Sequence, residues 1–138
     1  MTTIERELKD RTKRFGLRVL NRVESLPQER VSARIITNQL GRSGTSVGAN
    51  YRAACKGRSR AEFIAKIGIV EEEADESAHW LELVIESRLL GGTRVRPLLT
   101  EANELVAIMA ASRITAASRK AAARRGPIGN RQSAIGNP

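Results

Sequence analysis

The chain has 138 residues, a length typical of a single domain, and 41% of them are hydrophobic, which is enough to bury a core without disulfides. Aromatic residues make up only 3%, and no apolar run approaches the ~20 residues of a membrane span, so the composition excludes a transmembrane protein. No apolar segment follows the N-terminus and Cys55 is the only cysteine, so we expect no signal peptide, no internal disulfide and a cytoplasmic location.

The net charge of +9 is distributed unevenly along the sequence. Residues 1–60 hold 14 Lys and Arg against 5 Asp and Glu, residues 61–118 hold 5 against 10, and residues 119–138 hold 5 against none. The first half is therefore basic and the following part is acidic. Neutralisation could occur within a helical bundle, between protomers, or by nucleic acid on the basic face, and the sequence leaves these alternatives open.

Apolar residues at helical spacing predict a first helix from about Thr3 to Ser25, followed by Pro27, which cannot donate a hydrogen bond inside a helix. Its apolar stripe, interrupted by Thr12, consists of Ile4, Leu8, Phe15, Val19, Val23 and Leu26.

The second helix is predicted from Gln28 to about Cys55. Its stripe consists of Val31, Ile35, Leu40, Val47, Tyr51 and Ala54. Gly41, Gly44 and Gly48 each cost ~1 kcal/mol relative to alanine, so propensity alone would make SGTSVG a loop. We favour one continuous helix, because the apolar spacing continues through this segment and small residues would let a neighbouring backbone approach closely.

The segment KGRSR is predicted to be a tight turn between two helices. Gly57 suits a helix C-cap with positive φ. Ser59 and Glu62 have the spacing of a capping box directly before an apolar run.

Two further helices complete an all-α prediction without a sheet. The third is predicted from Arg60 to Leu90, ended by Gly91 and Gly92, and the fourth from near Thr93–Pro97 to Lys120. The stripe of the third consists of Phe63, Ile67, Val70, Ala74, Leu81, Val84 and Ile85, and that of the fourth of Leu98, Ala102, Leu105, Met109 and Ala116.

The C-terminal segment differs in composition from the rest of the chain. From Ala121 onward it is rich in Gly, Pro, Asn and Ser, contains no acid, and contains the sequence IGN twice. We interpret residues 1–120 as one helical domain and residues 121–138 as a disordered basic tail.

The residues offer no convincing catalytic or metal site. The Glu76–His79 pair has the spacing found in di-iron bundles, but the partner helix offers Glu101 and Glu104 without a second histidine. Cys55 has basic neighbours but no base partner. We therefore predict no enzyme, no cofactor and no metal, so that His79→Ala and Cys55→Ala should each leave function intact.

An antiparallel hairpin around KGRSR would place the second helix opposite the acidic part of the third. We expect Arg42 or Asn50 to form a buried polar link with an acid between Glu72 and Glu76.

The stretch from Gln39 to Leu83 resembles the signature of a known family, the 23S rRNA intervening-sequence proteins, which are four-helix bundles. The matching positions are Gln39, Leu40, Arg42, Ser46, Val47, Asn50, Glu62 and Phe63. The resemblance implies an antiparallel up-down-up-down four-helix bundle, commonly assembled into a ring-like homopentamer. It also implies a relationship to accessory proteins of diversity-generating retroelements, which assist a reverse transcriptase and bind nucleic acid, and it does not imply an enzyme.

Two functional hypotheses follow. The first is an oligomeric protein that binds RNA or DNA through backbone charge, since Tyr51 and Trp80 are almost the only aromatic side chains available for base stacking. The second is a scaffold or accessory subunit that docks a protein such as a reverse transcriptase, with nucleic acid incidental. The predicted nucleic-acid-binding residues are Arg52, Lys56, Arg58 and Arg60, with Lys13, Arg14 and Arg18 as further candidates and Arg119, Lys120, Arg124, Arg125 and Arg131 adding non-specific affinity.

Overall fold

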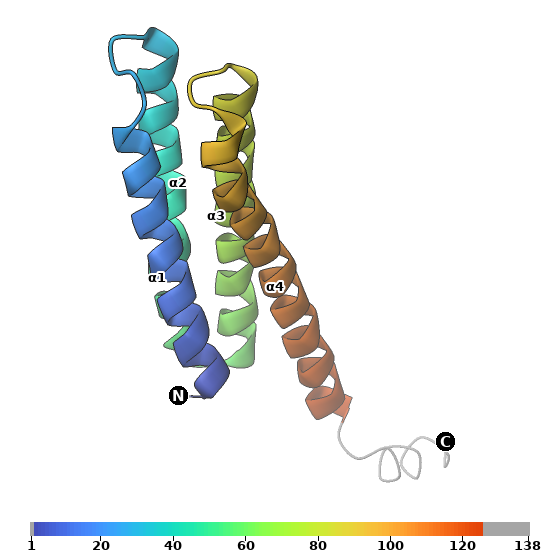
Figure 1. Cartoon of the computed structure of the whole chain (residues 1–138). Coiled ribbons are helices and arrows are strands. Elements are labelled where there is room, and N and C mark those ends of the chain that lie inside the picture. Colours follow the sequence, from blue (N-terminus) through green and yellow to red (C-terminus); the bar gives the residue numbers. More distant parts are fainter. Residues whose placement is uncertain (1, 126–138) are drawn as a thin grey trace, which may run out of the picture.

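A computed structural model describes residues 2–125, which form four helices and no strand. They are α1 (Thr3–Glu24), α2 (Val31–Cys55), α3 (Arg60–Glu86) and α4 (Gly92–Arg125). Short connections join antiparallel neighbours in the order of the sequence (Figure 1). The predicted all-α, up-down-up-down architecture is confirmed. None of the four helices has the length and hydropathy that a bilayer-spanning segment needs.

The segment SGTSVGAN lies inside α2, as predicted, and its glycines contact α1. A methyl group on Gly44 would lie 2.7 Å from both Cγ atoms of Val19, and one on Gly48 would lie 3.3 Å from the backbone of Thr12. On the facing helix, Gly16 would place a Cβ 3.6 Å from the carbonyl oxygen of Gly44. Close approach of α1 and α2 therefore explains these small residues, whereas Gly41 faces open space.

The α2–α3 turn forms where it was predicted, with two differences in detail. The φ of Gly57 lies outside the left-handed region, and glycine is needed because a Cβ would lie 3.1 Å from the carbonyl oxygen of Ala54. Ser59 caps α3 by accepting a hydrogen bond from the Glu62 N–H at 3.1 Å. The Glu62 carboxylate accepts from the N–H of Arg58 at 3.1 Å, one residue before the position that a capping box uses.

Helix α3 ends at Glu86, before the predicted end at Leu90, because Arg88 reverses the chain with a φ of 60°. The N–H of Leu89 donates to the Val84 carbonyl at 3.1 Å and that of Arg88 to the Ile85 carbonyl at 3.0 Å, which is the Schellman pattern with arginine in the usual glycine position. This ending turns the Leu89 side chain into the core, where it is buried.

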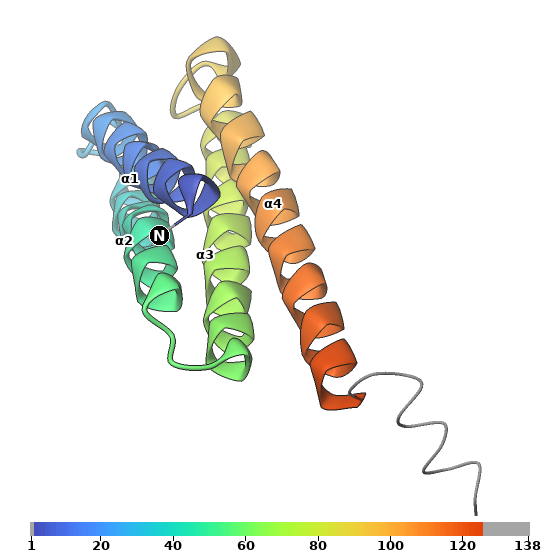
Figure 2. The ribbon, with the colours of Figure 1, turned by 90° about the horizontal axis from the view of Figure 1, so that it is seen from below.

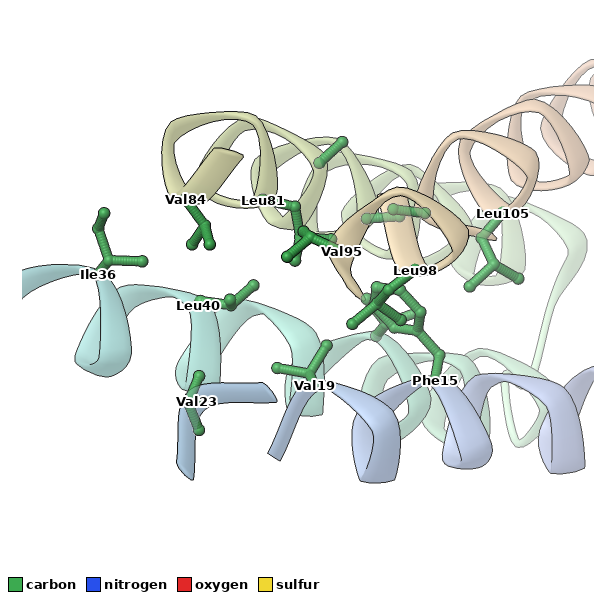
Figure 3. Close-up of a cluster of buried hydrophobic side chains, with 14 of the residues drawn as sticks. Phe15, Val19, Val23, Ile36, Leu40, Leu81, Val84, Val95, Leu98 and Leu105 are labelled. Carbon is green, nitrogen blue, oxygen red and sulfur yellow. The ribbon is translucent and has the colours of Figure 1, made fainter. Parts of the chain in front are cut away.

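The core lies between the α1–α2 and α3–α4 pairs (Figure 3). Its largest fully buried side chains include Phe15 and Val19 of α1, Leu40 of α2, Leu81 of α3, and Leu98 and Leu105 of α4. Most of the predicted stripes are buried, and the gap at Thr12 is closed because its hydroxyl donates to the Leu8 carbonyl at 2.7 Å. Three predicted core residues are exposed instead, namely Ile4, Val31 and Ile35.

At the start of α2, Ala33 and Ile36 take the buried positions that the sequence pattern assigned to Val31 and Ile35. Ile35 and Ile36 are adjacent apolar residues, and periodicity alone does not distinguish them before the facing helices are known.

Helix α4 diverges from the bundle toward its C-terminal end (Figure 1). It packs extensively against α3 but contacts α1 over only a short stretch. It also continues to Arg125, beyond the predicted end at Lys120, so Ala121–Arg125 are helical and are not part of a disordered tail. The rest of the predicted tail, residues 126–138, lies outside the described residues.

The glycine contacts predict opposite effects for two neighbouring alanine substitutions. Gly44→Ala should lower the free energy of unfolding by about 1–2 kcal/mol, because Val19 is β-branched and cannot easily yield to the new methyl group. Gly41→Ala should raise it by up to about 1 kcal/mol, since alanine favours the helix and nothing lies nearby. Urea titration followed by circular dichroism measures both, and equal effects would contradict the proposed contact.

Candidate nucleic-acid interface

Basic residues are concentrated at the end of the bundle that carries the α2–α3 turn. The segments that meet there, residues 3–13, 45–70 and 110–125, hold 14 Lys and Arg against 4 Asp and Glu. The other described segments, residues 14–44 and 71–109, hold 9 against 11. The charge is thus polarised along the bundle, and we call the first region the basic end (lower end in Figure 1).

The structure distributes the seven predicted binding residues over separate surfaces. Lys13 and Arg52 line a groove between α1 and α2. Arg58 and Arg60 line a hollow beneath the diverging end of α4. Arg14 and Arg18 line a smaller hollow on the α4-facing side of α1, and Lys56 is exposed at the end of α2 without lining any of the three.

The α1–α2 groove has a volume of about 590 Å³ and a floor of small residues, including Gly16 and Gly48. Arg6, Lys9 and Lys13 follow one another along its α1 side, and Arg52 faces them from α2. The partly exposed side chains of Leu17 and Leu20 also line it. This surface therefore combines positive charge with apolar area.

The hollow beneath α4, which we call the wedge, has a volume of about 1060 Å³ and is lined by residues of all four helices. Arg58 and Arg60 of the turn face Arg119 and Lys120 of α4 across it. The last two lie in α4, where the sequence predicted a helix as far as Lys120. The wedge brings basic residues from distant parts of the sequence to one place.

On the α4-facing side of α1, acids already neutralise much of the positive charge. Arg11 donates two hydrogen bonds of 2.7 Å to the Glu101 carboxylate and a third of 3.2 Å to Glu104. Arg14 pairs with Asp10 at 2.7 Å. Glu101 and Glu104, weighed from the sequence as possible metal ligands, are therefore partners of an arginine, and Arg14 is a weaker candidate for phosphate binding.

Arg42 links α2 to α3, but the link is not buried. Its guanidinium donates to Glu73 at 3.0 Å and also to Glu76, and its side chain is 50% exposed. Asn50 donates to the Ser46 carbonyl of its own helix at 2.9 Å, and Glu72 is exposed and makes no hydrogen bond or ion pair with the described residues.

A buried hydroxyl pair lies beside this link, with the Oγ atoms of Ser43 and Ser77 3.0 Å apart. Burial by itself would raise the pKa of Glu76, but hydrogen bonds from Trp80 and Arg42 outweigh it and hold that pKa below its usual range. The Glu76 carboxylate is therefore occupied within the bundle, and His79, its neighbour one turn along, is exposed with its ring edge-on to Trp80 at 5.1 Å.

Cys55 and Tyr51 are also poor candidates for chemistry. Burial raises the pKa of the Cys55 thiol and that of the Tyr51 hydroxyl, so neither is activated toward ionisation. Tyr51 is 2% exposed and is not available for base stacking. Among residues 2–125, no group of three or more His, Cys, Asp or Glu side chains is arranged to hold a metal ion.

Sequence reasoning did not single out Arg6 and Lys9 as binding residues. With Lys13 they have spacings of three and four, which place them on one face of a helix, so this signal was present in the sequence. The grouping of Arg58 and Arg60 with Arg119 carried no such signal, because it depends on how α4 lies against the turn.

Comparisons with known proteins agree with this fold. A family model described as 23S rRNA-intervening sequence protein matches residues 5–111. The chain is similar to a solved structure of a protein with unknown function from the S23 ribosomal protein family of Bacteroides thetaiotaomicron VPI-5482, at 33% identity and a TM-score of 0.68, over 74% of this chain and 94% of that one. No curated protein matches, and the descriptions of this family and of this solved structure name no enzyme.

The Arg11–Glu101 pair predicts a specific loss of stability in acid. The hydrogen bonds from Arg11 lower the pKa of Glu101, so the ionised carboxylate favours the folded state. This stabilisation is present above the pKa of an unfolded glutamate, about 4.3, and is lost as the pH falls through the lower folded value. Glu101→Gln should reduce the free energy of unfolding by about 1–2 kcal/mol at pH 7, with the difference from wild type shrinking below about pH 4.

Glu104→Gln is the matched control, because Glu104 is 58% exposed and contacts Arg11 only at 3.2 Å. Denaturant titrations between about pH 3 and 7 compare the three proteins. A difference between Glu101→Gln and wild type that stays constant over this range would show that the pair does not stabilise the fold.

Proposed function

Because the chain belongs to the 23S rRNA-intervening sequence protein family, we propose that it is a non-enzymatic, oligomeric four-helix-bundle protein that binds the backbone of RNA or DNA. The observation that supports this function best is the basic end. Its arginines and lysines come from all four helices and the α2–α3 turn, and those of the turn and the groove make no ion pair with the described residues. Such a surface attracts phosphates regardless of base sequence.

Recognition by charge and shape fits the scarcity of aromatic side chains. Tyr51 is buried, and Trp80 is partly buried with its indole N–H donating to Glu76 at 3.2 Å. Base stacking therefore has few platforms at the basic end, and phosphate contacts position a nucleic acid without selecting its sequence.

A non-enzymatic role agrees with the side chains that are present. Within residues 2–125, His79 and Cys55 lie apart from any partner set of the kind that acid–base or nucleophilic catalysis requires. We expect His79→Ala and Cys55→Ala to retain full nucleic-acid binding.

The oligomeric part of the proposal rests on the family resemblance, which implies a homopentamer, and on the surface of α1 and α2. Leu17 and Leu20 are 57% and 43% exposed beside the groove, and Val31 and Ile35 are exposed on α2. Large apolar side chains exposed on two neighbouring helices favour contact with another protomer. Charge polarity suits head-to-tail contacts, which close into rings when the rotation allows.

A scaffold that docks a protein partner is the second candidate function. The wedge favours it, because Ile4, Leu8 and Phe63 line it and a nucleic acid would not cover these apolar side chains. The two candidates share cations of the basic end but differ in whether they need the apolar side chains of the wedge, so they can be tested separately.

Binding of a fluorescent single-stranded RNA, followed by anisotropy, tests the first candidate. Affinity should fall steeply with salt, and reversing Lys13 and Arg52 together to Glu should weaken binding at least tenfold and lower the salt slope by about 0.7 per lost contact. Arg34→Glu combined with Arg96→Glu is the matched control, since both residues are exposed outside the basic end.

The titration is repeated on the full chain and on a chain ending at Arg125. Equal weakening by both double variants, or binding that disappears with residues 126–138, would overturn the assignment of the interface to the basic end. Absence of binding at low salt would overturn the nucleic-acid function itself.

Multi-angle light scattering tests the assembly. We expect a species of about five times the chain mass of 15.1 kDa, and a smaller species for Leu17→Asp combined with Leu20→Asp, because the paired carboxylates would have to be buried. Ile69→Asp, on α3, is the control, with Ile69 exposed to the same extent as Leu20. A wild-type monomer at micromolar concentration would refute the ring.

A further inference from the structure

The wedge exists because α4 leaves the bundle. The Arg11–Glu101 hydrogen bonds hold α4 to α1, and Leu105 and Met109 of α4 are still fully buried in the core. Beyond them α4 packs mainly on α3 and leaves the bundle (Figure 1). Figure 2, from the α2–α3 turn end, shows the last turns of α4 standing away from α1 and α2. At the end that carries the α2–α3 turn, α4 therefore does not complete the four-helix bundle.

The floor of the wedge is apolar and is contributed by three helices. Ile4 and Leu8 come from the first turns of α1, Phe63 from α3 and Ile108 from α4. Ile4 is 67% exposed, although the sequence pattern places it on the core stripe of α1. Ile4 extends the apolar stripe of α1 beyond the part that α4 covers. The N-terminal end of this stripe is therefore exposed to solvent.

The rim of the wedge is cationic. Arg58 and Arg60 approach from the turn, and Arg119 and Lys120 from α4. None of these four side chains makes a hydrogen bond or ion pair with the described residues, and Glu5 is the one acid that lines the wedge. A partner must therefore supply both apolar side chains for the floor and negative charges for the rim.

We propose that the wedge is the docking site for an acidic, amphipathic helical segment of a partner protein. A helix with leucine-like residues at spacings of three and four and Glu or Asp on its flanks meets both requirements, as helices in apolar grooves do. The volume of about 1060 Å³ has room for several large side chains. The chain's own residues 126–138 do not fit, because they contain Arg131 and no acid.

A nucleic acid matches only half of this surface. Its phosphates would pair with Arg58 or Arg119. However, the charged backbone would lose hydrating water where it lies against Ile4 and Phe63, and it would make no apolar contact to compensate. The floor of the α1–α2 groove consists of small residues such as Gly16 and Gly48, whereas large apolar side chains form the floor of the wedge. This difference assigns a protein ligand to one part of the basic end.

The test uses the full chain and a fluorescent helical peptide of about 18 residues, with Leu on one face and Glu on its flanks. Anisotropy titrations should show saturable binding, weakened about tenfold or more by Ile4→Asn and by Arg119→Glu. The matched controls are Ile114→Asn and Arg96→Glu. Ile114 is 60% exposed on α4, and neither it nor Arg96 lines the wedge. Both controls should bind the peptide as wild type does.

Because Ile4→Asn leaves the charge unchanged, it separates this proposal from nucleic-acid binding. Ile4→Asn should weaken binding of the peptide but leave the affinity for RNA unchanged, whereas Arg119→Glu should weaken binding of both. The proposal would be overturned if Ile4→Asn left peptide binding unchanged, or if a scrambled peptide of the same composition bound equally well. Either result would show that the peptide is attracted by charge alone. Absence of binding, or dissociation of the oligomer on adding peptide, would also overturn the proposal, the latter by showing that a second copy occupies the wedge.

Discussion

The close contact between α1 and α2 is the constraint on which the rest of the structure depends. Gly44 and Gly48 allow the backbone of α1 to lie against α2, and Thr12 closes the polar gap in α1 by bonding to its own helix. Phe15 and Val19 then reach the core from a helix that lies close to its partner. A larger side chain at Gly44 would push α1 away and open the layer that the α3–α4 pair packs against.

Arginine–carboxylate pairs join the other neighbouring helices. Arg42 links α2 to Glu73 and Glu76 of α3, Arg113 of α4 donates to Glu71 of α3 at 2.9 Å, and Arg11 joins α1 to α4. These pairs are partly exposed, so each adds modest stability. Their main effect is to fix the register of neighbouring helices. Apolar stripes of Leu, Val and Ala would still pack if one helix slid by a turn, whereas a bidentate arginine–carboxylate pair would break.

The sequence predicted the helices, the turn and most of the core, because helical periodicity and capping are local properties. It was wrong where the outcome depends on a neighbouring helix. Ile4 is exposed because α4 has diverged at that level, and Arg88 ends α3 because the following leucines are buried against the core. For the same reason the sequence could suggest the candidate binding residues one by one, but it could not predict their division between groove and wedge.

The same geometry explains why one end of the protein is so basic. The acids of α3 and α4 lie mostly at the middle level, where Glu71, Glu73, Glu76 and Glu101 accept hydrogen bonds from arginines of neighbouring helices. The cations of the groove and the wedge lie below that level, where few acids remain. Because the stabilising pairs and the unpaired cations are on different residues, charge reversal at Arg119 or Arg52 should alter binding without weakening the bundle, and this separation makes the proposed functions accessible to mutagenesis.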